Sequence, residues 1–190
     1  RRMGGRDKGL LELGGRPLVA RVLEAIAPQV ERVLISANRN RSAYAALGPP
    51  VVTDTAPGYP GPLAGMLAAL RAAETRFVLT LPCDAPWVAP DYAGRMAGPE
   101  RARVATLGGE LQPVFARLDA RLADDLEAAL AAGRRKTRAW LGDLGATPVP
   151  FDDRAEMFEN VNSAEELERL ERGLVTANGA AGKARNQPAP

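Results

Sequence analysis

The sequence contains no histidine in its 190 residues. Imidazole is the usual general base near neutral pH and a frequent zinc ligand, so its absence excludes histidine-based acid–base catalysis, serine–histidine triads and imidazole-ligated zinc sites. A single cysteine, Cys83, excludes an internal disulfide and fits a reducing compartment. Any chemistry must therefore use carboxylates, lysine, arginine, backbone amides or a hard metal ion.

Long apolar runs and a strong charge of one sign are also missing. No apolar run approaches the ~20 residues of a membrane-spanning helix, and no segment resembles a secretory signal. The net charge of +2 is too small to predict nucleic acid or an anionic membrane as a partner. With 46% hydrophobic and 25% charged residues, the composition is that of an ordinary globular protein, which we expect to form one domain.

The first eight residues, RRMGGRDK, are basic and contain two adjacent glycines. Glycine lets the backbone approach a ligand closely, and the surrounding Arg and Lys side chains suit a polyphosphate. The alternative interpretation is a frayed terminus without a ligand. The remaining motifs decide between the two.

Apolar patterning alternates between strands and helices along the chain. Strands are expected at 8–13, 30–37, 51–53, 77–81, 104–107, 113–118 and 147–151. Helices are expected at 18–26, 42–47, 66–73, 90–96, 119–132 and 164–172. A further helix is expected after the basic cluster at 134–138 and ends at Leu144. This alternation predicts an α/β fold, a single Rossmann-like doubly wound domain with a mostly parallel sheet. The domain is expected over residues 1–173, followed by a disordered tail at 174–190.

Polar side chains follow three of the expected strands. Ser36 and Asn38 end the first, Asp54 follows the second, and Asp84 follows the most apolar one. Doubly wound sheets bind ligands at the carboxyl ends of their strands, so we expect these residues to converge. Asp84 suits either a turn cap or a Mg²⁺ ligand, since Mg²⁺ is usually held by one or two carboxylates plus substrate phosphates. Asp54 suits either a cap or an acceptor for a base edge or a ribose.

Lys8 is the expected charge stabiliser of this site. In phosphoryl and nucleotidyl transfer the protein mainly positions substrates and neutralises developing charge. A phosphate nucleophile is already ionised near pH 7 and needs no general base. A site without histidine therefore fits this reaction class.

With these residues in place, the sequence resembles the molybdenum cofactor guanylyltransferases, which belong to the nucleotidyltransferase family that also makes sugar nucleotides. The motifs that carry the resemblance occur in the family's order and include Asp54. They are RRMGGRDKGLLEL at 1–13, SANRN at 36–40, YPGPLAGM at 59–66, PCDAP at 82–86 and NVN at 160–162. The resemblance implies a nucleotide-diphospho-sugar transferase-like fold over residues 1–172.

The resemblance also implies a reaction and roles for residues. The terminal phosphate of molybdopterin would attack the α-phosphate of GTP with Mg²⁺, releasing pyrophosphate. Lys8 matches the family's phosphate-contacting lysine, Asp84 its metal-binding aspartate and Asp54 an aspartate that contacts GTP. Ser36 stands where relatives often have a nucleotide-contacting asparagine, whereas Asn38 is retained. Positions at which relatives bind the pterin or complete the site are Arg2, Gly5, Gly61, Gly65, Arg135, Asn160 and Asn162.

One departure from the family lies at the start of the sequence. Relatives begin with an apolar strand and a Leu-Ala-Gly-Gly loop, and the given sequence begins after both. We therefore expect either a fragment of a longer protein or a translation start set too late. In this fold the first strand is central, so we expect its neighbours to keep unpaired edges and uncovered apolar faces.

Two other functions stay open at this stage. A related transferase could use CTP or a sugar phosphate, and a non-catalytic nucleotide- or partner-binding module could result from the missing strand. The resemblance further implies cytoplasmic cofactor assembly, with molybdenum-insertion proteins and apo-molybdoenzymes or their chaperones as protein partners.

Overall fold

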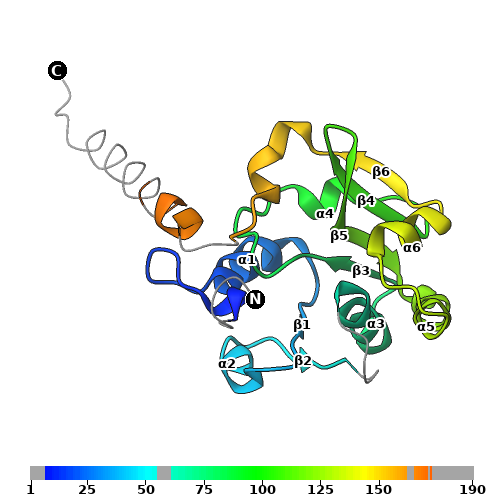
Figure 1. Cartoon of the computed structure of the whole chain (residues 1–190), viewed down its shortest axis with the longest axis horizontal. Coiled ribbons are helices and arrows are strands. Elements are labelled where there is room, and N and C mark those ends of the chain that lie inside the picture. Colours follow the sequence, from blue (N-terminus) through cyan, green and yellow to red (C-terminus); the bar gives the residue numbers. More distant parts are fainter. Residues whose placement is uncertain (1–6, 55–60, 162–164, 171, 173–190) are drawn as a thin grey trace.

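The computed structural model describes residues 7–54, 61–161, 165–170 and 172 (Figure 1). Strands and α-helices mostly alternate along this part of the chain, with short 3-10 helices between some of them. None of the described helices is both long and apolar enough to cross a lipid bilayer.

The strands form two separate sheets (Figure 1). In the first, β1 (Ile35–Ser36) and β2 (Val51–Val52) pair in parallel. The second sheet has the order β3-β5-β4-β6, formed by β3 (Phe77–Thr80), β5 (Glu110–Asp119), β4 (Ala102–Leu107) and β6 (Thr147–Pro150). In that sheet only β5 runs against the others, because it is antiparallel to both β3 and β4, while β4 and β6 are parallel. The expected α/β fold with a mostly parallel sheet is confirmed.

The helices connect these strands. The α-helices are α1 (Leu18–Ile26), α2 (Arg41–Ala45), α3 (Pro62–Ala72), α4 (Tyr92–Arg95), α5 (Ala123–Ala131) and α6 (Thr137–Asp143). The 3-10 helices are η1 (Lys8–Leu10), η2 (Ala27–Gln29), η3 (Ala120–Leu122) and η4 (Asp152–Phe158). Residues 165–170 are also helical.

The four-stranded sheet has helices on both faces, as a doubly wound fold requires. Along β4 and β5 successive side chains alternate between faces, so Val104 and Leu118 enter one core cluster while Ala105 and Phe115 enter the other. The first cluster contains side chains from α3, α5 and α6, including Trp140. The second contains side chains from α1 and α4. The sheet is thereby buried on both sides.

Helix α1 illustrates how the sequence determines an element. Leu18, Val22 and Ile26 recur at helical spacing, and all three are buried. Burial of each such side chain stabilises the fold by roughly 1.5–3 kcal/mol. Pro17 precedes the helix in an extended conformation, and Pro28 lies in the 3-10 turn that ends it. The expected boundaries of this helix are confirmed.

Several expected boundaries differ from the structure. The strand expected at 30–37 is reduced to β1, because only one of its edges has a partner strand. The extended piece expected at 8–13 begins instead with η1. Helix α3 starts at Pro62, four residues earlier than expected, since proline is favourable in a first helical turn. The helix expected from 119 starts as η3. Asp119 caps it, because its side chain accepts a hydrogen bond from the Arg121 backbone N–H.

Two expectations lie outside the described residues. The start of the helix expected at 164–172 is one, and the tail at 174–190 is the other. The division into a domain at 1–173 and a tail stays a prediction.

Candidate functional site

Lys8 and Asp84 lie side by side, although 76 positions separate them in the sequence. The Nζ atom of Lys8 is 3.4 Å from Oδ2 of Asp84. Lys8 is in η1, and Asp84 lies in the turn after β3. The side chains are 35% and 16% exposed, so a ligand can reach both. A cation and a carboxylate at a strand end form a suitable site for a polyphosphate and its counterion.

The backbone at Asp84 is tied to the segment that carries the NVN motif. The N–H of Val161 donates to the carbonyl oxygen of Asp84 at 3.0 Å, and Val161 is fully buried. Asn160 directly precedes Val161 in the sequence. It is therefore one residue away from the backbone contact with Asp84. Asn162 lies outside the described residues.

Asn38 and Asp54 form a second pair at the ends of β1 and β2. The side-chain amide of Asn38 donates to Oδ2 of Asp54 at 2.7 Å, and its oxygen accepts from the Asp54 backbone N–H at 2.9 Å. The other carboxylate oxygen, Oδ1, is buried and has no hydrogen-bond partner among the described residues. An unpaired buried acceptor costs roughly 1–3 kcal/mol, so this oxygen is suited to a ligand donor.

Gly65 lets the third predicted residue of this group, Ser36, approach helix α3. A Cβ atom added at Gly65 would lie 2.9 Å from the Ser36 Oγ and 3.9 Å from the Asp54 Oδ1. Any larger residue would push Ser36 away from the helix. The backbone of α3 therefore passes close to both polar side chains only because position 65 is glycine.

Gly61 is the residue before α3 and adopts φ 124° and ψ 178°. This conformation is nearly restricted to glycine, so the turn depends on this residue type. Pro62 follows at the first helical position, where its missing N–H costs nothing. The turn is followed by the first-turn backbone amides of α3, which have no partner within the helix itself. Those amides favour a negatively charged group at this end of the helix.

A cavity of about 380 Å³ joins these features. Its lining includes five of the predicted residues, namely Ser36, Asn38, Asp54, Gly61 and Gly65. The volume is within the range of small-molecule sites. The sequence prediction that the strand-end residues converge is confirmed for this group by their common cavity.

The loop between β1 and α2 links the cavity to the lysine. Asn38 holds Asp54, and two residues later Asn40 donates to Oδ2 of Asp7 at 3.1 Å. Asp7 directly precedes Lys8. One short loop thus contacts both the cavity and the segment that carries the lysine.

Not all predicted site residues belong to this group. Arg135 is exposed, and its guanidinium donates to carbonyl oxygens of Leu130 and Arg134 at the end of α5. Arg2 and Gly5 lie outside the described residues. Roles for these three residues, like the pterin contacts in general, stay predictions.

Cys83 keeps an exposed surface beside Gly9. Desolvation by neighbouring groups, with further contributions from the charges of Asp84 and Asp7, raises the pKa of its thiol to about 11. The thiol is therefore protonated at neutral pH and is no nucleophile for the site.

We call residues 7–9, which surround Lys8, the lysine segment. Two residues that fix this segment, Asp7 within it and Tyr44 beside it, were not identified from the sequence. Asp7 accepts a hydrogen bond from the hydroxyl of Tyr44, a buried residue of α2. The position of Asp7 beside Lys8 was a signal that could have been used. Tyr44 offered no signal, because an aromatic residue in a short apolar helix is typical of any core.

The site is suited to a metal ion only together with a ligand. Within the described residues, no three histidine, cysteine or acidic side chains converge into a complete metal site. Asp84 offers one partly exposed carboxylate, and Mg²⁺ commonly combines one or two carboxylates with phosphate oxygens. The donor set therefore fits Mg²⁺ bound together with a polyphosphate.

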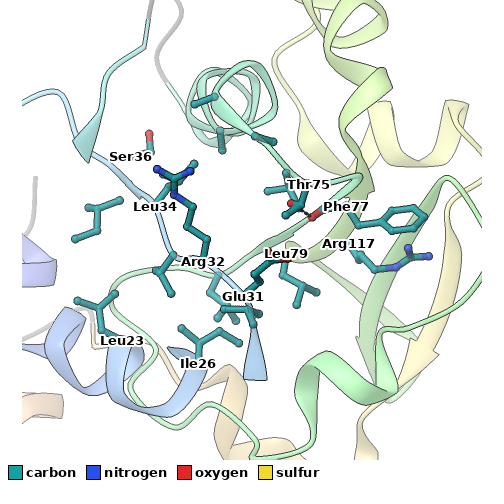
Figure 2. A pocket seen from close by; sticks show the side chains of 18 of the residues that line it. Leu23, Ile26, Glu31, Arg32, Leu34, Ser36, Thr75, Phe77, Leu79 and Arg117 are labelled. Carbon is teal, nitrogen blue, oxygen red and sulfur yellow. Dashed lines mark hydrogen bonds between the residues drawn. The ribbon is translucent and has the colours of Figure 1, made fainter. Parts of the chain in front are cut away.

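A larger cavity, about 550 Å³, lies between β1 and β3 and is lined mainly by apolar side chains (Figure 2). Figure 2 shows Leu34 on one side and Phe77 and Leu79 on the other, with Leu23 and Ile26 of α1 at one end. We call it the inter-sheet groove. Among the predicted polar site residues that the structure describes, only Ser36 lines it.

The chain is similar to several known proteins. The sequence profile described as the MobA-like NTP transferase domain matches residues 1–147. The molybdenum cofactor guanylyltransferase of Ralstonia nicotianae is 44% identical over 183 residues, which cover 89% of each chain. The protein of the same name from Shewanella putrefaciens is 41% identical over 175 residues, 90% of each chain.

Solved structures share the fold. Molybdopterin-guanine dinucleotide biosynthesis protein A from Archaeoglobus fulgidus has a TM-score of 0.75 at 24% identity, over 92% of this chain and 94% of that one. The 2-C-methyl-D-erythritol 4-phosphate cytidylyltransferase from Thermus thermophilus has a TM-score of 0.66 at 18% identity, over 87% and 92%. At these identities the likeness concerns the fold alone.

Proposed function

Because this chain belongs to the family of MobA-like NTP transferase domains, we propose that its site transfers GMP from GTP to the terminal phosphate of molybdopterin. The product is the guanine dinucleotide cofactor, and pyrophosphate is released. The protein is a nucleotidyltransferase, as its relatives of 41–45% identity are. The observation that carries the proposal is the loop after β1, which holds Asp54 of the cavity through Asn38 and Asp7, the neighbour of Lys8 in the Lys8–Asp84 pair, through Asn40.

The chemical step needs no general base from the protein. An ionised oxygen of the molybdopterin phosphate forms a bond to the α-phosphorus of GTP. The bond from that phosphorus to the oxygen bridging the α- and β-phosphates breaks, and pyrophosphate leaves with the electron pair. This accords with a site that has no histidine and a Cys83 thiol that stays protonated.

The residues of the site divide this work. Lys8 offers a positive charge to the phosphates of GTP. During transfer, negative charge builds up on the leaving pyrophosphate, and the ammonium group stabilises it. Asp84 would hold Mg²⁺, which when bound supplies further positive charge to the phosphates. Asp54 offers the unpaired Oδ1 to a donor on the base or the ribose, and Asn38 and Ser36 complete that side of the cavity.

The proposal extends to the surroundings of the enzyme. Both substrates are small molecules, and the product is a cofactor that molybdoenzymes require. We propose that the reaction takes place in the cytoplasm and that molybdenum-insertion proteins, apo-molybdoenzymes or their chaperones are the protein partners. Pull-down with a purified apo-molybdoenzyme tests this part separately from activity.

The activity test follows pyrophosphate release with molybdopterin, Mg²⁺ and one nucleotide at a time. We expect turnover with GTP and much less with CTP or ATP. The assay is run on the chain and on a version extended at its N-terminus by an apolar strand and a Leu-Ala-Gly-Gly loop. A preference for CTP in both forms would overturn the guanylyl assignment.

Asp84→Ala tests the expected metal ligand. We expect the variant to lose Mg²⁺-dependent turnover by about a hundredfold or more, since a charge-stabilising group is lost at the reacting phosphates. Its circular dichroism spectrum should match that of the parent. Asp91→Ala is the control, because it removes an exposed carboxylate from the start of α4. Near-normal turnover in Asp84→Ala would remove Asp84 from the metal site.

A further inference from the structure

Tyr44 lies under the lysine segment and contacts the residues on both sides of Lys8. Its hydroxyl donates to Oδ1 of Asp7 at 2.7 Å. On the other side, a Cβ atom added at Gly9 would lie 2.6 Å from the same hydroxyl oxygen. The side chain of Asp7 and the backbone of Gly9, one on each side of Lys8, therefore both lie against one phenolic group.

The ring of Tyr44 is itself fixed. The residue is 4% exposed and belongs to a core cluster with Val19 of α1 and Ile35 of β1. Leu10, the last residue of η1, packs against the same cluster. The hydroxyl therefore cannot move without disturbing packing between two helices and a strand.

Further contacts hold Asp7 in the same orientation. Its Oδ2 accepts from the Asn40 side-chain amide at 3.1 Å, and the Nε of Arg39 lies 3.7 Å away. The Asp7 side chain is only 13% exposed. Burial, followed by the hydrogen bond to Asp7, raises the pKa of the Tyr44 hydroxyl, so it stays a donor throughout the physiological range.

We propose that Tyr44 is a positioning residue for nucleotidyl transfer: through Asp7 and Gly9 it fixes the segment of Lys8, so that the ammonium group stays beside Asp84. The role rests on the proposed function only in naming the reaction that Lys8 serves. The alternative is that Tyr44 contributes to core stability alone. The two differ in what loss of the hydroxyl does to the lysine.

Tyr44→Phe removes the hydroxyl and keeps the ring. We expect kcat to fall about ten- to hundredfold, because small displacements of a group that acts in the transition state have effects of this size. The KM for GTP should change less than about threefold, since binding contacts elsewhere in the cavity are kept.

Tyr92→Phe is the matched control. Tyr92 is also a fully buried tyrosine, and its hydroxyl donates to the Thr80 carbonyl oxygen at 3.2 Å, away from the lysine segment. Both variants should lower the melting temperature, but only Tyr44→Phe should lower kcat. A kcat of Tyr44→Phe that equals that of Tyr92→Phe would overturn the proposal.

A second measurement is independent of activity. The chain contains three lysines, Lys8, Lys136 and Lys183, so selective ¹³C labelling at the lysine ε-carbon produces few NMR signals. Lys8→Arg identifies the Lys8 signal. We expect the two ε-protons of Lys8 to have distinct shifts in the parent and in Tyr92→Phe, and to merge in Tyr44→Phe.

These two measurements separate the proposals. If the parent protein transfers no GMP, the proposed function fails, and the NMR comparison alone decides the role of Tyr44. If the Lys8 signal is the same in the parent and in Tyr44→Phe, the positioning role is wrong whatever the activity.

Discussion

At the scale of single residues, the two oxygens of the Asp54 carboxylate have different surroundings. Oδ2 is held by the Asn38 amide, whereas Oδ1 has no partner among the described residues. The two hydrogen bonds between Asn38 and Asp54 fix both the side chain and the backbone of the aspartate. Asn38, expected to contact the nucleotide, therefore acts at least in part through Asp54.

Asn38→Ala tests this arrangement. A hydrogen bond to a charged group is worth roughly 1.5–3 kcal/mol, so we expect the KM for GTP to rise by about tenfold or more while kcat changes little. Inosine triphosphate, which lacks the 2-amino group, and 2′-deoxy-GTP distinguish a base donor from a ribose donor. The analogue that lacks the donor should be affected least by the substitution.

The control for that experiment is Ser42→Ala, an exposed position on α2 four residues further along. It should leave KM unchanged. An unchanged KM for GTP in Asn38→Ala as well would show that the orientation of Asp54 does not depend on Asn38.

The sequence predicted Asp84, Asn38 and Asp54 because a general rule places ligands at the carboxyl ends of parallel strands, whereas Lys8 was predicted from the basic, glycine-containing segment that it ends. That rule concerns positions that directly follow a strand. It cannot identify Tyr44, whose role depends on the direction of its hydroxyl towards residue 7. Such a direction follows from tertiary packing between α1, β1 and α2.

At the scale of elements, the junction between β5 and η3 depends on one buried carboxylate. The Asp119 side chain is fully buried and accepts hydrogen bonds from the Arg121 backbone and from its guanidinium, at 2.7 Å from Nη2 to Oδ2. Arg76, just before β3, lies 3.5 Å from the same oxygen. Two strands and the first turn of the helical segment thereby meet at Asp119.

These contacts give a pH-dependent stability. The Arg121 hydrogen bond is the main cause that lowers the pKa of Asp119 below its ordinary value. Because the folded pKa is below the unfolded one, the stabilisation is complete above the unfolded value near pH ~4, and it is lost as the pH falls through the folded value. Asp119→Asn should therefore cost about 1–2 kcal/mol of unfolding free energy at pH 7, and progressively less below about pH 4.

Urea denaturation at pH 7, 5 and 3 measures this difference. Asp124→Asn is the control, since its ion pair with Arg71 is on the surface, where such pairs contribute about 0–1 kcal/mol. A difference between Asp119→Asn and the parent that stays constant from pH 7 to pH 3 would contradict the ionic origin of the stabilisation.

The limits of an element were predicted well where the local sequence pattern determines them. They were predicted less well where pairing with a neighbouring strand determines them. Helix α1 has the expected limits because proline and apolar spacing are local signals. The apolar run at 30–37 was expected as a full strand, yet only Ile35–Ser36 is paired. A strand requires partners on its edges, and the sequence of the strand itself does not report whether they are present.

At the scale of the whole molecule, the inter-sheet groove separates two strand edges that face each other. The backbone N–H groups of Ile35 and Ala37 bond to β2, so those of Leu34 and Ser36 point the other way. On the opposite side, the Arg76 carbonyl oxygen accepts from the N–H of Ala120, directly after β5, so the alternate residues Phe77 and Leu79 present their backbone to the groove. Figure 2 shows the side chains between these edges.

This geometry accommodates one additional strand with an apolar sequence. Asp7 lies at the carboxyl end of β1, against Asn40 and Tyr44. A strand entering from the N-terminal side of residue 7 and lying in the groove would therefore run in the same direction as β1 and β3. It would join the two sheets into one. The expectation from the sequence of a central first strand stays a prediction, and the groove is the place in which it can be tested.

A version of the chain extended at its N-terminus by an apolar strand of about eight residues and a Leu-Ala-Gly-Gly loop tests this geometry. Each buried Val, Leu or Ile side chain contributes roughly 1.5–3 kcal/mol, and 1 kcal/mol shifts the melting temperature of a domain of this size by about 2–4 °C. After the entropy of ordering the strand is subtracted, we expect a rise of more than about 5 °C. The control extension has serine at each apolar position, which removes the burial but keeps the length. Equal melting temperatures for both extensions would mean that the groove does not bind a strand, whereas a rise confined to the apolar version means that the two sheets require it to form one core.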